Sequence, residues 1–479
     1  MKKNVNLWII FCSIFLFSIK WYYPFSNFDE SIDVRIIFES TSDGYIYYPY
    51  LKALSNFNLN YSFDPSIENL GTISFPAGAF FLHLIFYLLI GSWSFVVLEF
   101  FFILIFLIIF YKIFRLLSFE RTQSLSLSVT LFTIPIFLQV LDLNNLTYFT
   151  VISADFFTLR FPRPMISNVF FFSFILFLIK FNRKKIFLKK NFIILGILSS
   201  LSFTSFYPHF IVEQISLLFF LVYKFKSQTI EKLKQNNPCI ISYILSFVLV
   251  SAPLLINMYF IEPDFLERNG LANLDYVKKI ILFKYHFLKL LKIEFLIIFI
   301  ITIFLIILFN LKKSFKELKK LNIFFIIFYS SIISPFVFIL ISHKYANHFY
   351  HFNNTIVICA FLLLFFSACS IIKTYLYKNF FSKITNFLFI FLLITCLVAN
   401  FFQTYKNYNK NNLTEENKSK RKEFNKVANI INEMDLLNKQ NNLSLLTFDN
   451  KFLVWSILNE IKYLKIVNGV IVPKKNEMI

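Results

Sequence analysis

Long apolar runs of about 17–25 residues, enough to cross the hydrocarbon core of a bilayer as a helix, recur from residue 5 to residue 402. Short polar segments rich in Lys and Arg separate them. Hydrophobic residues make up 57% of the chain and charged residues only 16%, whereas soluble proteins carry about 25% charge. The pattern excludes a soluble globular enzyme and a disordered chain, and it predicts an all-α protein that crosses a membrane many times.

The basic segments decide how many of these runs cross the membrane. Candidate spans lie at 5–23, 75–91, 92–115, 122–141, 164–181, 191–207, 209–225, 238–261, 293–311, 321–342, 355–372 and 384–402. Basic clusters lie at 112–121, 180–190, 224–236, 312–320 and 373–383. If every run spans and Lys2 and Lys3 are inside, all these clusters face outward, against the bias that keeps Lys and Arg in the cytoplasm. If 75–91 instead lies along the outer surface, they all become cytoplasmic. We therefore predict about eleven spans, a cytoplasmic N-terminus and an outward C-terminal tail.

This topology divides the chain into a transmembrane domain, 1–402, and an outward-facing soluble tail, 403–479. The transmembrane domain carries a long first outer loop, 24–91, with juxtamembrane helices. In the tail, helical and strand patterns alternate at 421–437, 443–448, 451–460 and 463–467, which predicts a small α/β unit. Such a small unit buries little core alone, so we expect it to dock on the outer loops. No further element follows the last predicted strand to cover it, which is the pattern expected of a truncated tail.

The basic clusters between the apolar runs explain the net charge of +21. No nucleic-acid partner is therefore expected.

One aspartate of the first outer loop is distinguished by its position. Asp43 directly precedes an aromatic-rich stretch, Tyr45–Leu54, which has the pattern of a short amphipathic helix lying on a membrane. Two interpretations are open. Asp is a favoured helix N-cap and needs no other role at this place. Alternatively, the carboxylate is a catalytic group just above the bilayer.

The order of elements around Asp43 carries a resemblance to a known family. After one span, Asp43-Gly44-Tyr45 opens the interfacial helix, and an apolar helix follows from Phe75-Pro76-Ala77-Gly78 to Gly91. A further span and a basic cytoplasmic turn come next. This order resembles the GT-C superfamily of membrane glycosyltransferases, such as protein O-mannosyltransferases and lipid A aminoarabinose transferases, over residues 1–200. The family's usual pair of adjacent acids is Asp43-Gly44 here, which leaves the second acid and any metal requirement open.

The resemblance implies a reaction and a location. It implies that a sugar moves, with inversion, from a polyprenyl-phosphate donor to a glycan, lipid or protein acceptor on the periplasmic face of the inner (plasma) membrane. Asp43 takes the place of the family's general base, which removes the proton of the attacking hydroxyl. The sequence contains no Gly-rich loop for a nucleotide phosphate, which agrees with a lipid-linked donor. No cofactor is expected, and a divalent metal has no support in the sequence.

The second outer loop, 142–163, supplies candidates for binding the donor phosphate. Arg160 and Arg163 lie on the predicted outer side just before a span, against the positive-inside trend, and Arg can bind phosphate through two hydrogen bonds. The alternative is that both side chains reach lipid headgroups. Asp155 is the preferred candidate for the second acid because it is close to these arginines in the sequence.

A later loop contains Lys344, Tyr345, His348 and His351. The two histidines have a spacing that binds a metal when it falls on a helix, but no acid is nearby. We therefore expect this group to contact the phosphate or the sugar. The alternative is an aromatic belt at the membrane interface.

His209 follows Tyr207-Pro208 at the predicted outer end of a helix, with Glu213 one turn later. An ionisable residue at membrane depth is a functional candidate, and we expect His209 to contact substrate, although a structural polar role fits equally well.

For the whole chain the alternatives are a non-catalytic polytopic membrane protein and a transporter or flippase of envelope polysaccharide. Transport is disfavoured because the apolar runs hold few charges.

Overall fold

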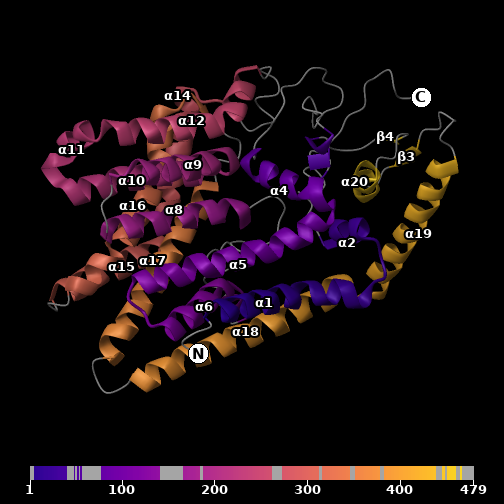
Figure 1. The fold of residues 1–479 in the computed structure, drawn as a ribbon, viewed down its shortest axis with the longest axis horizontal. Coiled ribbons are helices and arrows are strands. Elements are labelled where there is room, and N and C mark those ends of the chain that lie inside the picture. The colour runs from indigo at the N-terminus through magenta and orange to yellow at the C-terminus, as the bar shows by residue number, and fades with distance from the viewer. Residues whose placement is uncertain are drawn as a thin grey trace.

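The computed structural model describes residues 5–39, 48, 51–52, 54–56, 77–140, 165–183, 187–260, 272–311, 315–345, 351–377, 382–437, 445–447, 450–459 and 464–466. The helices are α1 (Val5–Asn27), α2 (Ile32–Glu39), α4 (Ala77–Ile90), α5 (Trp93–Leu116), α6 (Arg121–Val140), α8 (Met165–Arg183), α9 (Lys189–Ser205), α10 (Tyr207–Phe225), the short 3-10 helix η2 (Lys226–Gln228), α11 (Thr229–Gln235), α12 (Asn237–Phe260), α14 (Tyr276–Leu290), α15 (Ile293–Leu311), α16 (Phe315–Ile341), α17 (His351–Tyr377), α18 (Ser382–Asn412), α19 (Glu415–Leu437) and α20 (Asn450–Leu458). The strands are β1 (Ala272–Asn273), β2 (Lys344–Tyr345), β3 (Leu445–Thr447) and β4 (Leu464–Ile466). Figure 1 shows the helices arranged as a bundle, with α19 and α20 at one end.

The core of the bundle is built on α5. Its Phe106, Phe110 and Phe114 recur every four residues, which places them on one helix face, and all three are buried. Phe106 and Phe110 meet Phe172 of α8 at ring-centroid distances of 5.7 and 5.2 Å. Phe114 meets Phe366 of α17 at 4.9 Å. Large aromatic rings thus fill the space between the central helices.

Six described helices are long and apolar enough to cross a membrane: Val5–Asn27, Trp93–Leu116, Asn237–Ile256, Lys320–Ile341, His351–Lys373 and Asn386–Lys410. The count becomes seven if the bent pair Tyr276–Leu290 and Phe295–Ile307 crosses as one span. The described residues therefore form an all-α multi-pass membrane protein, as predicted, with an apolar surface suited to a lipid bilayer. They do not support about eleven spans.

The missing spans have a physical explanation in the side chains of the intervening helices. α6 buries Ser and Thr side chains along its length, among them Ser124, Ser128 and Thr133. α9 has only 17 residues and buries Ser199, Ser200 and others. These hydroxyl side chains are covered by neighbouring helices rather than by lipid, so both helices pack into the bundle without the hydropathy of a lipid-facing span.

The helix α4, which covers most of the segment 75–91, is not among the candidate spans. It has 14 residues and is therefore about 21 Å long, shorter than a hydrocarbon core of about 30 Å. The predicted non-spanning character of this segment agrees with its length. On which side of the membrane it lies remains a prediction.

An ion pair inside the bundle joins the first two long helices. Lys20 of α1 lies 3.2 Å from Glu99 of α5, and Trp21 Nε1 donates a hydrogen bond to Glu99 at 2.8 Å. Glu99 is buried. A carboxylate in this position needs such partners, because an unpaired charge at membrane depth is costly.

The two ends of the bundle differ in what they carry. Figure 1 shows α11 at the left of the bundle and α2, α19 and α20 at the right. The basic cluster 224–236 covers the end of α10, η2 and α11, so it lies at the end opposite to α2. The orientation of these two ends in a membrane remains a prediction.

A second apolar core lies at the right-hand end, and we call it the α2 cap. It contains buried residues from α2, from the described part of 48–54, from α4, from the start of α5, and from α19 and α20: Val34, Ile36, Ile37, Tyr48, Leu51, Leu54, Phe80, Tyr87, Phe95, Val96, Phe424, Ala428, Val454, Trp455 and Leu458, with Trp21 of α1. The tail thus packs on the segment between α1 and α5, as the sequence predicts for a unit with little core of its own.

The tail itself is mainly helical. β3 and β4 pair in parallel over three residues each, with α20 between them in the chain. The expected small α/β domain is not supported, because this strand pair is minimal and the main contacts of α19 and α20 are with the α2 cap.

Candidate functional site

The residues predicted to act on substrate divide into two groups. Asp43, Asp155, Arg160, Arg163 and His348 lie outside the described residues. Of the others, His209 and His351 are described with their side chains, whereas Lys344 and Tyr345 are described as the backbone of β2. The site can therefore be built from the two histidines outward.

His209 lies in the first turn of α10, directly after a break between two helices. α9 ends at Ser205, Phe206 has an extended backbone, and α10 begins at Tyr207 with Pro208 in its first turn. Proline fits this position because a backbone N–H in the first turn of a helix has no partner within the helix, so nothing is lost when proline lacks it. Pro208 therefore starts a new helix, and the turn places His209 inside the bundle, where it is fully buried.

Protein side chains hold both ring nitrogens of His209. Nε2 lies 2.9 Å from Asn168 Oδ1 of α8, and Thr355 Oγ1 of α17 lies 3.2 Å from Nδ1. Because the amide oxygen only accepts, Nε2 carries the hydrogen and Nδ1 accepts from Thr355. The ring also stacks on Phe171 at 4.5 Å. His209 therefore ties α8, α10 and α17 together as a neutral imidazole, which favours the structural interpretation of this residue over direct contact with substrate.

Three histidines meet around the start of α10, and we call them the histidine cluster: His209, His286 and His351. The Phe206 ring contacts His209 at 4.6 Å and His351 at 5.5 Å, so it brings together two residues that the sequence analysis selected separately. His286 of α14 is buried, lies beside Asn353, and faces the Phe352 ring at 6.3 Å.

A short strand pair brings Lys344 and Tyr345 into the same part of the molecule. Ala272 pairs with Tyr345 and Asn273 with Lys344 in the antiparallel β1–β2 pair. Leu274 N–H also donates to the His343 carbonyl at 2.8 Å. Because β1 directly precedes α14, which carries His286, the backbone at Lys344 is anchored to the element that completes the histidine cluster.

The helix α4 connects the histidine cluster to the α2 cap. At its start, a Cβ on Gly78 would lie 2.4 Å from Thr204 Oγ1 and 2.7 Å from Ser205 Oγ. A larger residue would force both hydroxyls to move, so glycine permits this close approach of α4 to the end of α9. Farther along α4, Tyr87 and His83 contact Phe95 at 6.0 and 5.6 Å.

The described residues on either side of Asp43 are both anchored in the α2 cap. On the N-terminal side, Glu39 ends α2 and accepts hydrogen bonds from the tail. On the C-terminal side, the Tyr48 ring meets Phe95 at 4.7 Å edge to face, and Lys52 lies over the Tyr87 ring at 5.8 Å. The described residues before and after the segment that contains Asp43 thus pack at the same apolar core.

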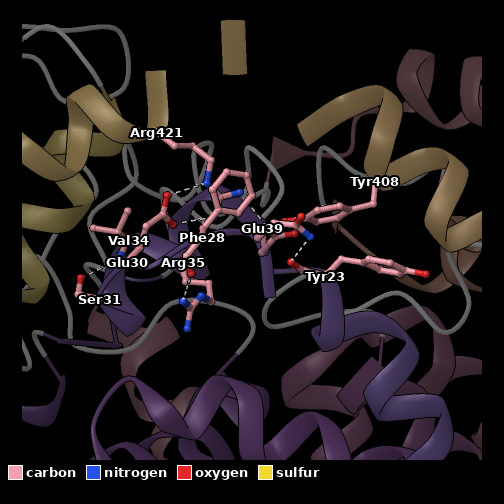
Figure 2. A network of polar contacts seen from close by, with 10 residues as sticks. Tyr23, Phe28, Glu30, Ser31, Val34, Arg35, Glu39, Tyr408 and Arg421 are labelled. Carbon is pink, nitrogen blue, oxygen red and sulfur yellow. Dashed lines mark hydrogen bonds and ion pairs between the residues drawn. The ribbon is translucent and has the colours of Figure 1, made fainter. Parts of the chain in front are cut away.

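A buried arginine from the tail closes the α2 cap (Figure 2). Arg421 of α19 donates from Nη2 and Nε to the two oxygens of Glu30 at 2.7 and 2.9 Å, and from Nη1 to Glu39 at 3.0 Å. Its guanidinium lies over the Phe28 ring at 3.8 Å and the Phe38 ring at 4.8 Å. We call this arrangement the Arg421 clasp.

The carboxyl groups of the Arg421 clasp strengthen the positive charge of its guanidinium. Burial acts to lower the pKa of Arg421, but the hydrogen bonds and charges of Glu30 and Glu39 outweigh it and raise the pKa above its ordinary value. The Tyr408 hydroxyl of α18 donates to Glu39 at 3.3 Å. The Arg421 guanidinium thus holds α19, and the Tyr408 hydroxyl holds α18, to the carboxyl groups at the two ends of α2.

The sequence analysis missed several residues of this region. Asn168 follows Ser167 near the start of an apolar run, and Asn353 and Thr355 belong to the short polar stretch Asn353-Asn354-Thr355 that opens another; these polar residues at the starts of apolar runs were the only signal available. The partners of Arg421 could not be found from the sequence, because 391 residues separate it from Glu30. The described part of the chain has no group of three His, Cys, Asp or Glu side chains that could hold a metal ion.

Comparison with known proteins adds no assignment to this geometry. The chain matches no known protein family, and it matches no curated protein.

Proposed function

We propose that this protein is an integral-membrane glycosyltransferase that moves a sugar from a polyprenyl-phosphate donor to an envelope acceptor outside the plasma membrane, with inversion. The observation that carries the proposal is the position of α4. Its start packs on the α9–α10 break beside the histidine cluster, and its later residues pack in the α2 cap, which anchors both flanks of Asp43.

The arrangement supports a division of roles. In the proposed step, the acceptor hydroxyl oxygen forms a bond to the anomeric carbon while the bond from that carbon to the phosphate oxygen breaks. Asp43 takes the hydroxyl proton as general base. The polyprenyl phosphate leaves with the bonding electrons, and Arg160, Arg163 and Lys344 are proposed to stabilise its charge. Asp155 is proposed to assist as a second acid.

The histidine cluster has two proposed functions. His209, whose ring nitrogens both contact protein side chains, fixes the start of α10 and positions the cluster. His351, Tyr345 and His348 are proposed to contact the donor headgroup. The support is that His351 contacts Phe206 and that Tyr345 is in the strand that pairs with β1, directly before α14.

The test uses the purified protein in lipid nanodiscs with radiolabelled undecaprenyl-phosphate glucose, mannose and aminoarabinose as donors, and membranes of the source cells as acceptor. We expect label transfer from one of these donors, release of undecaprenyl phosphate, and an inverted anomeric configuration in the product. UDP-sugars in place of the lipid donors should give no transfer. Folded protein that transfers label from none of the lipid donors, or retains the configuration, contradicts the proposal.

A further inference from the structure

The hairpin formed by α9 and α10 encloses an acidic side chain that the proposed reaction does not use. Glu213 of α10 is fully buried. Ser202 of α9 donates to its Oε1 at 2.6 Å, whereas its Oε2 makes no hydrogen bond to a described residue. The Ser199 side chain, one turn before Ser202 on the same face of α9, lies beside the Glu213 carboxyl.

A third helix completes the surroundings of Glu213. Tyr243 of α12 donates its hydroxyl to Gln214 Oε1 at 2.6 Å and lies beside both Ser199 and Glu213. The contact between α9 and α12 is tight, because a Cβ on Gly196 would lie 2.5 Å from the Tyr243 carbonyl oxygen. Hydroxyl oxygens of α9 thus lie against the Glu213 carboxyl, and the Tyr243 hydroxyl of α12 reaches the neighbouring Gln214.

Buried hydroxyls in the bundle fall into two groups, and both groups have members elsewhere in the described helices, such as Ser330 and Ser367 among those without a hydrogen-bond partner. Thr204 and Ser251 donate to backbone carbonyls four residues earlier in their own helices, which is the usual solution for a buried helical hydroxyl. Ser199 and Ser216, although fully buried, make no hydrogen bond to a described residue. Buried polar atoms without protein partners are rare and point to a bound ion or water.

The helices α9, α10 and α12 place no Lys or Arg side chain near Glu213. The Lys residues of α9 and α10 are Lys189, Lys190 and Lys224, which lie at the far ends of those helices, about 16 Å or more along the helix axis from Glu213 or its partner Ser202. α12 contains no Lys or Arg. His209, one turn before Glu213, is neutral and bound to Asn168 and Thr355. A buried carboxylate must be neutralised, either by a proton or by a cation.

We infer that Glu213, Ser199 and Ser202, with Gln214 and Tyr243, form a binding site for a monovalent alkali cation. Carboxylate, hydroxyl and amide oxygens are the ligands that hard cations prefer. A single carboxylate balances one positive charge, so a divalent ion would remain uncompensated in the bundle. The bound cation joins α9, α10 and α12, and the site is independent of the proposed transfer reaction.

The test is the thermal unfolding temperature of the full-length protein in detergent, measured against NaCl, KCl or LiCl at constant ionic strength set with N-methylglucamine chloride. A ligand that binds only the folded state raises the unfolding temperature with its concentration. We expect a saturable rise with one of the alkali cations. Glu213→Gln, which keeps the shape of the side chain, should remove this response, and Ser199→Ala should move it to higher concentration.

Ser251→Ala is the matched control, because the Ser251 hydroxyl is on α12 and bonds to Phe247 O; it should keep the full response. If the protein unfolds at the same temperature in each alkali chloride as in N-methylglucamine chloride alone, the inference is overturned. A response that Glu213→Gln retains also overturns it, as does one that depends only on pH, which would identify a protonated carboxyl instead. Isothermal titration of the folded protein with the most effective cation gives a second readout if Glu213→Gln does not fold.

Discussion

Arg421 in the tail and Glu30 just after the first helix form a buried ion pair with two hydrogen bonds, although they are 391 residues apart in the sequence. Both side chains are almost fully inaccessible, at 1% and 5% exposure. The pair fastens the tail to the segment between α1 and α4. Because this segment carries Asp43 in the sequence, the tail packs beside the residues that flank the proposed general base.

Replacing Arg421 by Ala should strongly destabilise the protein. The change leaves Glu30 and Glu39 buried without their partner, and breaking such a pair by removing one member typically costs about 3–5 kcal/mol. Arg421→Lys should recover only part of the loss, because Lys lacks the planar fork that bonds both Glu30 oxygens. The measurement is the unfolding temperature in detergent micelles.

Lys418→Ala is the matched control on the same helix. Lys418 pairs with Glu415 on the surface, where the side chains are 44% and 91% exposed, and exposed pairs contribute little. If Arg421→Ala and Lys418→Ala unfold at the same temperature, the Arg421 clasp does not hold the tail.

The half-buried Asp33 of α2 should make stability depend on pH. Burial raises the pKa of Asp33 above its ordinary value of 3.8, although the Ser92 hydroxyl and Lys52 partly offset this. The folded protein therefore holds the proton more tightly than the unfolded chain, so stability falls as the pH rises past 3.8 and through the folded value. Asp33→Asn, which still accepts from Ser92, should unfold at a higher temperature near neutral pH.

This gain should shrink as the pH is lowered toward 3.8. Asp29→Asn, a change at an exposed acid of the same loop, is the control and should show no such trend. A gain from Asp33→Asn that stays constant across the pH range would mean that the carboxylate charge is not the cause.

Thr355 should stabilise the bundle through its hydroxyl. Thr355→Val keeps the shape of the side chain but leaves His209 Nδ1 without its donor, and an unsatisfied buried acceptor costs about 1–3 kcal/mol. Thr355→Ser keeps the hydroxyl and should stay close to the native unfolding temperature. Equal unfolding temperatures for the Val and Ser variants would show that the bond to His209 contributes nothing.

The approach of α4 to α9 should require glycine at position 78. Gly78→Ala places a Cβ against Thr204 Oγ1 and Ser205 Oγ, and overpacking of this kind costs about 1–3 kcal/mol. Adding Thr204→Ala and Ser205→Ala removes both clashing atoms and should restore the unfolding temperature. A triple variant no more stable than Gly78→Ala alone would contradict this explanation.

The sequence was sufficient for the features that depend on local pattern. The apolar runs predicted the all-α membrane fold, and the shortness of the segment around α4 agrees with a non-spanning helix. The positions of α19, α20, β3 and β4 also follow the local patterns of the tail. The number of spans was wrong because Ser-rich and Thr-rich helices such as α6 were counted by length, whereas their hydroxyl side chains face other helices.

The rest depends on contacts between distant segments. No local pattern identifies Phe206 as the residue that contacts both His209 and His351, or Glu30 and Glu39 as the partners of Arg421. No local pattern identifies His286 as a neighbour of Phe352 either. The role assigned to Asp43 stays a prediction, because this residue is outside the described part of the chain.

The most direct test of the account is the transfer rate of Asp43→Asn with the polyprenyl-phosphate donor that the native protein uses, at equal protein levels in nanodiscs. Asn keeps the size of the side chain and caps a helix nearly as well as Asp, but it cannot take the proton of the acceptor hydroxyl. Asp29→Asn serves as the control for loss of a loop charge. We predict that Asp43→Asn lowers the rate by a factor of about 10²–10⁴ while the unfolding temperature stays the same. A near-native rate for Asp43→Asn would contradict the account and leave Asp43 as a helix cap.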